Sequence, residues 1–384
     1  MCEVIRQIHP IGQGAFYTET FFVDNKSFSV VYDCGSYWDG LKKKFSNVHP
    51  LKGVIDDFIN KRGRDVKFIF ISHFHADHIN GIKYLLNCIN NGVKIYLPWM
   101  NRTVKLFYFI ENIYEMGGIN NVEEEYSQWL YDLFFGNAEY KYELLSEEDY
   151  ENENSQKNVQ RCARIDIIES YPLWEYIPFV YNDKGLNGEV ELFMSELFGK
   201  KIVKSDYDSL ISILRDDWER IEKLVSTIRD TKDGRKICGN NTSLMLYSGP
   251  RHFDLSWIDA PAVRLPRYPY HCDCCRMDRK IGSGCLYVGD MMTAKAYEYL
   301  SENMPARARR NIGLLQLSHH GDDNEMNNRL VDLCIPNAFC CFGTKNTYHH
   351  PEWNTINEHL ISGANVFPIN EQTHRGLIQR IDLD

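Results

Sequence analysis

The chain has 384 residues, of which 43% are hydrophobic and 25% are charged, a composition typical of a folded globular protein with a substantial core. Its formal net charge of −10 argues against a protein that coats nucleic acid by long-range attraction, although a phosphate could still bind locally beside a metal cation. No apolar run approaches the roughly 20 residues of a membrane-spanning helix, and the start, MCEVIRQIHPIGQG, lacks the apolar segment of a secretory signal. We therefore expect a cytoplasmic protein without membrane association, whose 12 cysteines are reduced thiols or metal ligands.

Short β-like runs alternate with helical segments over the first hundred residues. FFVDNKSFSVVYDCGS predicts two strands joined near residues 24–26, LKGVIDDFINKR predicts a helix, and DVKFIFIS predicts another strand. A helix in INGIKYLLNCINN and a strand in VKIYLP follow. The alternation returns in NNTSLMLYS, CLYVGDM, NIGLLQLSHHG, NAFCCFGT and ANVFPI, with a helix around PEWNTINEHLIS. This order predicts a layered α/β domain built from both ends of the chain.

Residues 100–236 interrupt that alternation with acidic clusters and many aromatic side chains. The segment SDYDSLISILRDDWERIEKLVSTIRD, residues 205–230, predicts one long amphipathic helix with Ser205 as a possible N-cap. We interpret the region as a largely helical insertion that caps the core or binds a protein partner or a second copy. A separately folding helical domain is the alternative. The predicted boundaries are 1–99 for the first half of the core, 100–236 for the insertion and 237–384 for the second half.

The stretch ISHFHADHINGI, residues 71–82, places three histidines and an aspartate within six positions after an apolar strand. Along an extended backbone, residues two apart point the same way, so His73 and His75 can reach one ion together. Asp77 and His78 follow where the chain turns into a helix, and they can face a second point nearby. Imidazole and carboxylate are good ligands for zinc, manganese or iron(II).

This HxHxDH pattern resembles the signature of the metallo-β-lactamase fold superfamily, whose fold is a four-layer αββα arrangement. Asp33, in VYDCGS, resembles the strand-end aspartate that supports the ligand loop, and Asp290, in LYVGDM, resembles the aspartate that bridges two metals. IGQGAFYTETFF, NNTSLML, LSHHGDD and GTKNTYHHP resemble elements of the hydrolase domain of ComEC-type DNA-uptake proteins and their soluble relatives. Ala15 stands where that group has an acidic residue, and its membrane segments are missing, so a transport role is not implied.

The resemblance implies two divalent ions, Zn²⁺ or Mn²⁺, with one histidine contributed by the HHG element and one by the HP element. The expected metal ligands are His73, His75, Asp77, His78, Asp290, His319 and His350. One ion would take His73, His75 and one of the adjacent pair His319 and His320, with His319 favoured. The other would take Asp77, His78 and His350, which is favoured over His349. Asp290 would bridge the ions, and Asp33 would hydrogen-bond a ligand or the ligand loop.

Two such ions lower the pKa of a bridging water and stabilise the attacking and leaving oxygens. The expected catalytic residues are Asp77, Asp290 and His320, the last as a proton donor to the leaving group. Asn241 and Asn346 are candidate substrate donors, although an asparagine in a turn equally often binds backbone groups. The GQG at residues 12–14 lacks the lysine of a phosphate-binding loop and predicts a tight turn near the site instead.

The ComEC-like elements favour a phosphodiester substrate in nucleic acid or a nucleotide; the alternative is a non-phosphate ester, thioester, lactone or lactam. Arginines interleaved with aromatic residues between 251 and 280, and ARARRN at residues 306–311, suit phosphate and bases, but they are equally consistent with solvated loops. A mononuclear persulfide oxygenase and a non-enzymatic scaffold remain further alternatives.

The segment HCDCCRMD, residues 271–278, allows a structural zinc site. Its expected ligands are His271, Cys272, Cys274 and Cys275, perhaps completed by Cys238 or Cys285. Because CxCC is not the usual zinc-knuckle spacing, ordinary reduced thiols are the favoured interpretation.

Overall fold

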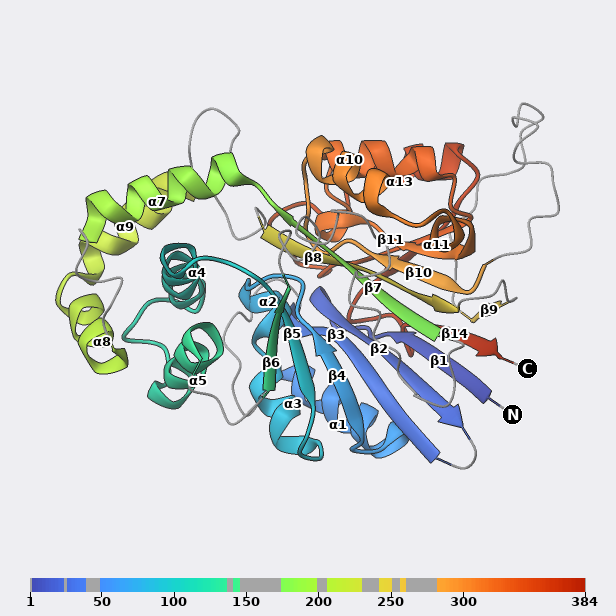
Figure 1. Cartoon of the computed structure of the whole chain (residues 1–384), viewed down its shortest axis with the longest axis horizontal. Helices are drawn as coiled ribbons and strands as arrows, with labels where there is room; N and C mark the ends of the chain where they lie inside the picture. Colours follow the sequence, from blue (N-terminus) through green and yellow to red (C-terminus); the bar gives the residue numbers. More distant parts are fainter. Residues whose placement is uncertain are drawn as a thin grey trace, which may run out of the picture.

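The computed structural model describes residues 2–23, 26–38, 49–136, 141–145, 174–198, 206–229, 242–250, 256–259 and 282–383. Two mixed sheets lie face to face at its centre, and helices cover their outer faces (Figure 1). The eight-stranded sheet has the order β6-β5-β4-β3-β2-β1-β14-β9, and the six-stranded sheet has the order β13-β12-β11-β10-β8-β7. This is the expected four-layer arrangement.

The strands of the two sheets come from both halves of the chain. The first sheet contains β1 (Cys2–Ile8), β2 (Gln13–Val23), β3 (Lys26–Trp38), β4 (Val66–Phe70), β5 (Lys94–Pro98), β6 (Lys141–Leu145), β9 (Ser256–Asp259) and β14 (Leu377–Asp382). The second contains β7 (Trp174–Asn182), β8 (Thr242–Pro250), β10 (Gly284–Tyr287), β11 (Ile312–Gln316), β12 (Asn337–Cys341) and β13 (Asn365–Ile369). Strands β3 to β6 are parallel to one another, as are β10 to β13. In each sheet, therefore, the carboxyl ends of consecutive parallel strands lie at one edge, where loop residues can converge.

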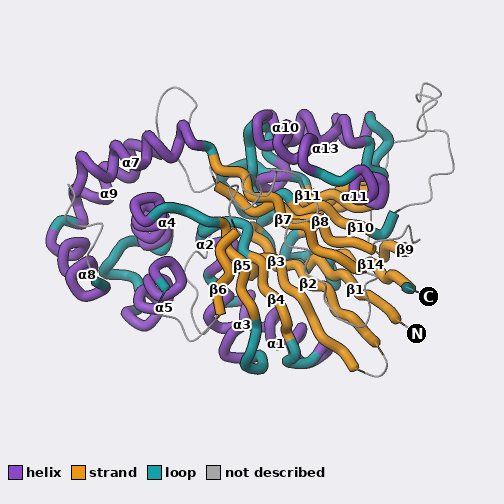
Figure 2. The backbone as a smooth tube through the Cα atoms, viewed as in Figure 1, coloured by secondary structure: helices purple, strands orange, loops and turns teal. Residues whose placement is uncertain are grey.

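Helices of the N-terminal and C-terminal halves cover different sheets (Figure 2). On the first sheet lie α1 (Pro50–Arg62), α2 (Ala76–Ile79) and α3 (Ile82–Cys88), and on the second lie α10 (Ala294–Asn303), α11 (Ala306–Asn311), α12 (Glu325–Leu330) and α13 (Trp353–Ile361). Two 3₁₀ turns, Ser318–Gly321 and Val331–Leu333, connect elements of the second half. No described helix combines the length and apolarity needed to span a membrane.

Three buried clusters fill the three interfaces of this arrangement. Between the sheets, the Tyr32 and Tyr287 rings stack at 4.9 Å, and Tyr17 stacks on Tyr287 at 5.6 Å. In the same layer, Arg6 donates from Nε to Oε1 of Glu19 over 2.6 Å, with both side chains buried. The aromatic stack ties the first sheet to the second. Arg6 also connects them, because its Nη2 donates to the Ser248 carbonyl of β8 over 3.1 Å.

The described part of residues 100–236 holds α4 (Arg102–Glu115), α5 (Glu124–Phe135), α7 (Lys184–Phe198), α8 (Tyr207–Asp216) and α9 (Trp218–Arg229). It also contributes β6 and β7, which are edge strands of the two sheets. Buried residues of α4, α5, α8 and α9 belong to the same hydrophobic cluster as those of α1, α3 and β4. This shared core favours a cap over a separately folding domain, and the boundaries given above remain a prediction.

The single helix expected over residues 205–230 is wrong, because the chain forms α8 and α9 with a break at Asp217. Asp217 has φ −126° and ψ 21°, and its carboxylate accepts from Arg220 over 3.0 Å at the start of α9. The N-cap of α8 is Asp206, whose side chain accepts from the Ser209 N–H over 2.9 Å. Ser205 lies outside the described residues.

Candidate metal centre

The ligand loop joins the carboxyl end of β4 to α2, and glycine backbone packs against it. A Cβ on Gly35 would lie 2.5 Å from backbone atoms of Asp77 and His78. Gly14, at φ +142°, approaches the Asp77 carbonyl so closely that a Cβ would lie 2.6 Å from it. Only glycine allows these contacts. The GQG and DCG segments therefore form close backbone supports for the loop. GQG lies near the site as expected, but Gln13 and Gly14 begin β2 and do not form the expected tight turn.

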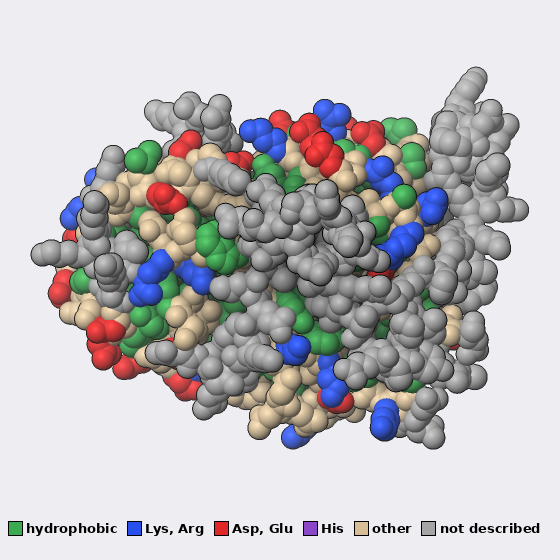
Figure 3. Space-filling view, in the orientation of Figure 1, with side chains coloured by type: hydrophobic (Ala, Val, Ile, Leu, Met, Phe, Trp, Pro, Cys, Tyr) green, Lys and Arg blue, Asp and Glu red, His purple; other side chains and the backbone are tan. Residues whose placement is uncertain are grey.

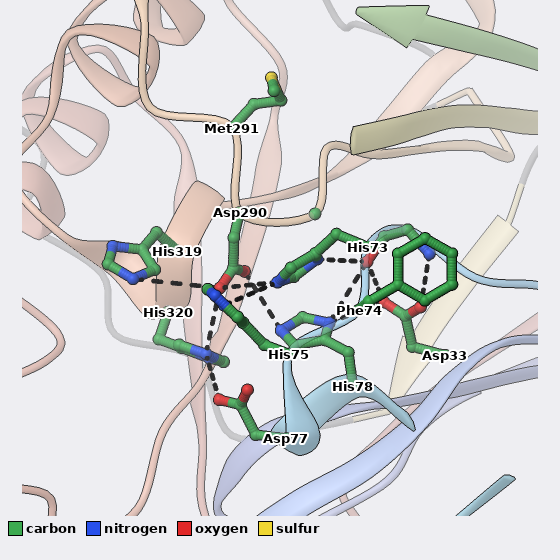
Figure 4. A network of polar contacts seen from close by, with 12 residues as sticks. Asp33, His73, Phe74, His75, Asp77, His78, Asp290, Met291, His319 and His320 are labelled. Atoms are coloured by element: carbon green, nitrogen blue, oxygen red, sulfur yellow. Dashed lines mark hydrogen bonds and ion pairs between the residues drawn. The ribbon is translucent and has the colours of Figure 1, made fainter. Parts of the chain in front are cut away.

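Asp33 fixes the orientation of the first imidazoles (Figure 4). Its Oδ1 accepts from the Ser72 N–H over 2.7 Å, and its Oδ2 accepts from Ser72 Oγ over 2.6 Å and from His78 Nδ1 over 2.8 Å. Ser72 Oγ is also 2.9 Å from His73 Nδ1 and can accept its proton. With both Nδ1 atoms protonated by these contacts, His73 and His78 direct their Nε2 lone pairs toward Asp290. The distances from Nε2 to the Asp290 carboxylate are 3.7 Å for His73 and 3.4 Å for His78.

Two segments from the C-terminal half complete the centre. Asp290 follows β10, and His320 lies in the 3₁₀ turn after β11. His320 Nδ1 donates to the Cys341 carbonyl over 2.8 Å, which leaves Nε2 at 3.2 Å from Asp77 Oδ2 and 3.6 Å from Asp290 Oδ2. His319 and His320 both have left-handed backbone, with φ of 48° and 59°. Such conformations are strained for histidine, and here they present two consecutive rings to the centre.

The donor atoms fit divalent ions. His73, His78 and Asp290 form one group, and Asp77, His78 and His320 form another, with all ligand atoms within 4.8 Å of one another in each. His75 Nδ1 lies 3.2 Å from His73 Nε2 and thus faces the first group. The Nε2 atoms of His78 and His320 and the Oδ1 of Asp290 are buried without a hydrogen-bond partner. Buried polar atoms are rarely left so, and cation coordination accounts for all three.

The charges around these donors produce a strongly negative potential. Burial acts to lower the pKa of His75, but the carboxylates of Glu115 and Glu111 outweigh it and raise that pKa to about 9. Burial likewise opposes protonation of His78, yet Asp290 and Asp33 raise its pKa well above the ordinary histidine value. Positive charge is therefore favoured here, as a cation site requires.

Helix α4 from the 100–236 region reaches directly into the ligand loop. Asn112 Nδ2 donates to the Phe74 carbonyl over 2.6 Å, and Glu115 Oε2 accepts from the Ala76 N–H over 3.1 Å. Glu111 Oε2 lies 3.7 Å from His75 Nε2. All three α4 side chains are buried. Sequence reasoning missed them because acidic and amide residues in a helix are ordinarily solvated, and only the position of α4 gives them this role.

Residues 14–136 match the family model for the metallo-beta-lactamase superfamily. The matched segment contains β2, β3, the complete ligand loop and α4. This segment therefore resembles the metallo-β-lactamase superfamily. Its members are generally metal-dependent hydrolases that use divalent ions, and the ligand loop described above provides donors of the matching kind.

Two further comparisons give little beyond this. No curated protein matches the sequence significantly. Among the solved structures, unliganded yeast PDE1 is similar over 99% of this chain and 99% of its own, with 10% sequence identity and a TM-score of 0.36. A similarity of that size carries no argument about substrate. The resemblance to ComEC-type hydrolase domains remains a prediction from the motifs.

The structure groups the expected ligands of this centre differently from the sequence prediction. His320, rather than His350, lies with Asp77 and His78. His319 instead lies with Asp322 and His350 in a third group. His350 is buried and His349 is exposed, so the HP element places His350 nearer the centre.

Asn346 folds the loop that carries His350. Its Nδ2 donates to the Gly343 and His350 carbonyls over 2.6 and 2.8 Å, and its Oδ1 accepts from the His350 N–H over 3.0 Å. Both amide protons are thus used by backbone groups, which favours the turn interpretation over that of a substrate donor.

Several expectations fall outside the described residues, so the structure says nothing of them. These are Asn241, the possible zinc ligands His271, Cys272, Cys274, Cys275 and Cys238, and the arginines at 251, 264, 267, 276 and 279. Cys285 is a buried residue of β10. In ARARRN, Arg307 pairs with buried Glu175 and Arg309 donates to Ser301 Oγ over 2.6 Å, so both have partners within the protein. On the face drawn in Figure 3, the described acidic and basic side chains are interspersed.

Proposed function

We propose that this protein is a dinuclear metal-dependent hydrolase that cleaves a phosphodiester in nucleic acid or a nucleotide. In this proposal His73 Nε2 and His75 Nδ1 hold one ion, while Asp77, His78 Nε2 and His320 Nε2 hold the other, and Asp290 is shared. The observation that carries it is the convergence of unpartnered buried donors on one point from both ends of the chain. His320 here takes the place beside Asp77 and His78 that the sequence prediction gave to His350, because its Nδ1 is held by the Cys341 carbonyl and its Nε2 faces both aspartates.

A pair of divalent ions would supply an activated water and stabilise the charge that develops on the attacked and leaving oxygens. The chain's own groups orient the donors: Asp33 and Ser72 set the tautomers of His73 and His78, and the Cys341 carbonyl sets that of His320. Zinc and manganese both accept this imidazole and carboxylate set.

The phosphodiester is supported by the ComEC-like motifs and by an aromatic ring beside the centre. Tyr348 is 43% exposed, and its ring stacks on His350 with centroids 5.8 Å apart and planes 13° apart. An exposed aromatic face next to a phosphoryl site can stack on a base. The carboxylates of the metal centre also repel an anionic substrate until cations compensate them, so hydrolysis should depend on added metal.

The test is a substrate panel with Mn²⁺- or Zn²⁺-loaded protein, comprising cyclic and linear dinucleotides, single-stranded DNA and RNA, a lactam, a lactone and a thioester. We expect hydrolysis of a phosphodiester that is lost in Asp77→Asn and Asp290→Asn and retained in the matched control Asp323→Asn, whose side chain is exposed. Turnover of the lactone, thioester or lactam with every phosphodiester left intact would support the alternative hydrolase instead. Metal-loaded protein that hydrolyses nothing in either class would refute the enzymatic proposal.

A further inference from the structure

A third cluster of metal-binding type lies beside the dinuclear centre and is not used by it. It consists of His319, Asp322 and His350, whose ligand atoms lie within 4.8 Å of one another. Asp322 Oδ2 is 3.1 Å from His319 Nδ1, and Asp322 Oδ1 is 3.9 Å from His350 Nδ1. The two imidazoles thus flank one carboxylate.

The strongest evidence for a bound ligand is the burial of His350 and the lack of a hydrogen-bond partner for its Nδ1. Its side chain is 5% exposed, and its Nδ1 is buried without a hydrogen-bond partner while facing Asp322. A buried imidazole nitrogen that lacks a hydrogen-bond partner and lies beside a carboxylate is well placed to bind a metal ion.

The spacing also suits coordination. For metal–ligand bonds of about 2.1 Å, donor atoms 3.1 and 3.9 Å apart subtend roughly 95° and 135° at the ion, within the range of four- and five-coordinate sites. His319 and Asp322 are each 26% exposed, which leaves room for water or an anionic group in a remaining position.

The backbone around the cluster is held in place. The Asp322 carbonyl accepts from Asn327 Nδ2 over 2.7 Å and from Thr355 Oγ1 over 3.0 Å. Asn346 closes the turn before His350 through the hydrogen bonds described above. Helices α12 and α13 therefore fix the loops that carry the three donors, as a preformed site requires.

We propose that His319, Asp322 and His350 bind a third divalent cation, separate from the dinuclear pair and more open to solvent. In this arrangement His319 Nδ1 faces the third ion and Nε2 faces Asp290 at 4.0 Å, so one ring connects the two sites. The proposal concerns metal binding alone and does not depend on the substrate.

The test is the number of Mn²⁺ ions bound per chain after equilibrium dialysis at fixed free Mn²⁺. Manganese is chosen because thiolates prefer softer metals, so the cysteine-rich segment should not contribute. We expect three ions in the wild type. Asp322→Asn and His350→Ala should each weaken the third by at least about tenfold and leave two. The adjacent exposed residues supply matched controls, so Asp323→Asn and His349→Ala should retain three.

The outcomes separate this proposal from the proposed function. Asp290→Asn should weaken the first two ions and leave the third bound, as a titration followed by electron paramagnetic resonance would show. A wild type that binds only two ions, or a third ion that persists in both Asp322→Asn and His350→Ala, would overturn the third site and leave the dinuclear hydrolase intact. Circular dichroism shows whether each variant is folded. Asp322→Asn and His350→Ala lie in different loops, so if one of them misfolds the other still tests the third site.

Discussion

Replacement of Glu115 tests whether α4 contributes to metal binding as well as to folding. Its buried carboxylate accepts from the Ala76 N–H over 3.1 Å and from Tyr37 Oη over 2.8 Å. Ala76 begins α2, the helix that carries Asp77 and His78. Glu115→Ala leaves two buried donors without this acceptor, and we expect a loss of about 2–4 kcal/mol in the free energy of unfolding. Glu115→Gln keeps an acceptor of the same shape and should lose less.

The metal affinity should fall in both variants, because each removes a negative charge near the centre. The same charge also favours protonation of His75, whose pKa is raised to about 9. Its removal therefore also weakens the binding of the proton that competes with the metal ion for the His75 imidazole. A dication feels the lost carboxylate about twice as strongly as a proton does, and the net effect is weaker metal binding. Outer residues of metal sites typically contribute 10–100-fold in affinity, or about 1.4–2.7 kcal/mol, and we expect a change in that range.

Competition with a chromophoric chelator measures the metal affinity, and urea unfolding of the metal-free protein measures the stability. Glu124→Ala, which removes an exposed carboxylate from α5, is the matched control and should change neither by much. If Glu115→Gln and Glu115→Ala bind metal as tightly as the wild type while only stability falls, Glu115 is purely structural, and the link between α4 and the metal centre is wrong.

Three further perturbations follow from the contacts described. Asp33→Asn should remove the carboxylate that holds the proton on His78 Nδ1, and metal affinity should fall roughly 10–100-fold. The same chelator competition measures this change, and an unchanged affinity would contradict the orienting role of Asp33. Arg6→Met should cost about 3–5 kcal/mol of unfolding free energy because it leaves the buried Glu19 carboxylate without its cationic partner, although Ser248 Oγ still donates to it. The Arg6→Met/Glu19→Leu double variant should recover part of that loss in urea unfolding. Burial lowers the pKa of His9 to about 3, so below about pH 6.5 the unfolded chain binds a proton that the folded chain does not. The unfolding free energy should therefore fall by up to about 1.4 kcal/mol per pH unit as the pH decreases toward 3, and His9→Gln should reduce that slope between pH 7 and 5.

The sequence predicted the elements around the ligand loop well, because their periodicity is strong and their ends are marked. Strands β2, β3 and β4 and helix α1 all appear where the pattern placed them. The long helix over 205–230 failed for a local reason. Its apolar stripe continues through the break, and only the backbone at Asp217, with its bond to Arg220, interrupts it. The periodic spacing of apolar residues therefore does not reveal such a break in a helix.

The site was predictable in part for a topological reason. Residues after β4, β10 and β11 meet because the carboxyl ends of parallel strands lie at one edge of each sheet, and the sheets face each other. The choice between His319 and His320 was not predictable. It depends on the left-handed backbone at both residues and on the Cys341 carbonyl that holds one ring. Neither the left-handed backbone nor the contact with the Cys341 carbonyl can be predicted from the residue types alone.

The position of α4 explains how an irregular segment in the middle of the chain can be integral to a centre whose ligands come from its two ends. The metal centre gathers several carboxylates in a buried space, and a carboxylate there is stable only when hydrogen bonds or cations compensate it. Glu115 meets this need by accepting from the first N–H of α2, which places its charge at the positive end of that helix. The same charge deepens the negative potential at His75. Folding of the ligand loop and attraction of cations are therefore two consequences of one arrangement, and an anionic substrate can approach only after the cations have reversed the potential that α4 helps to create.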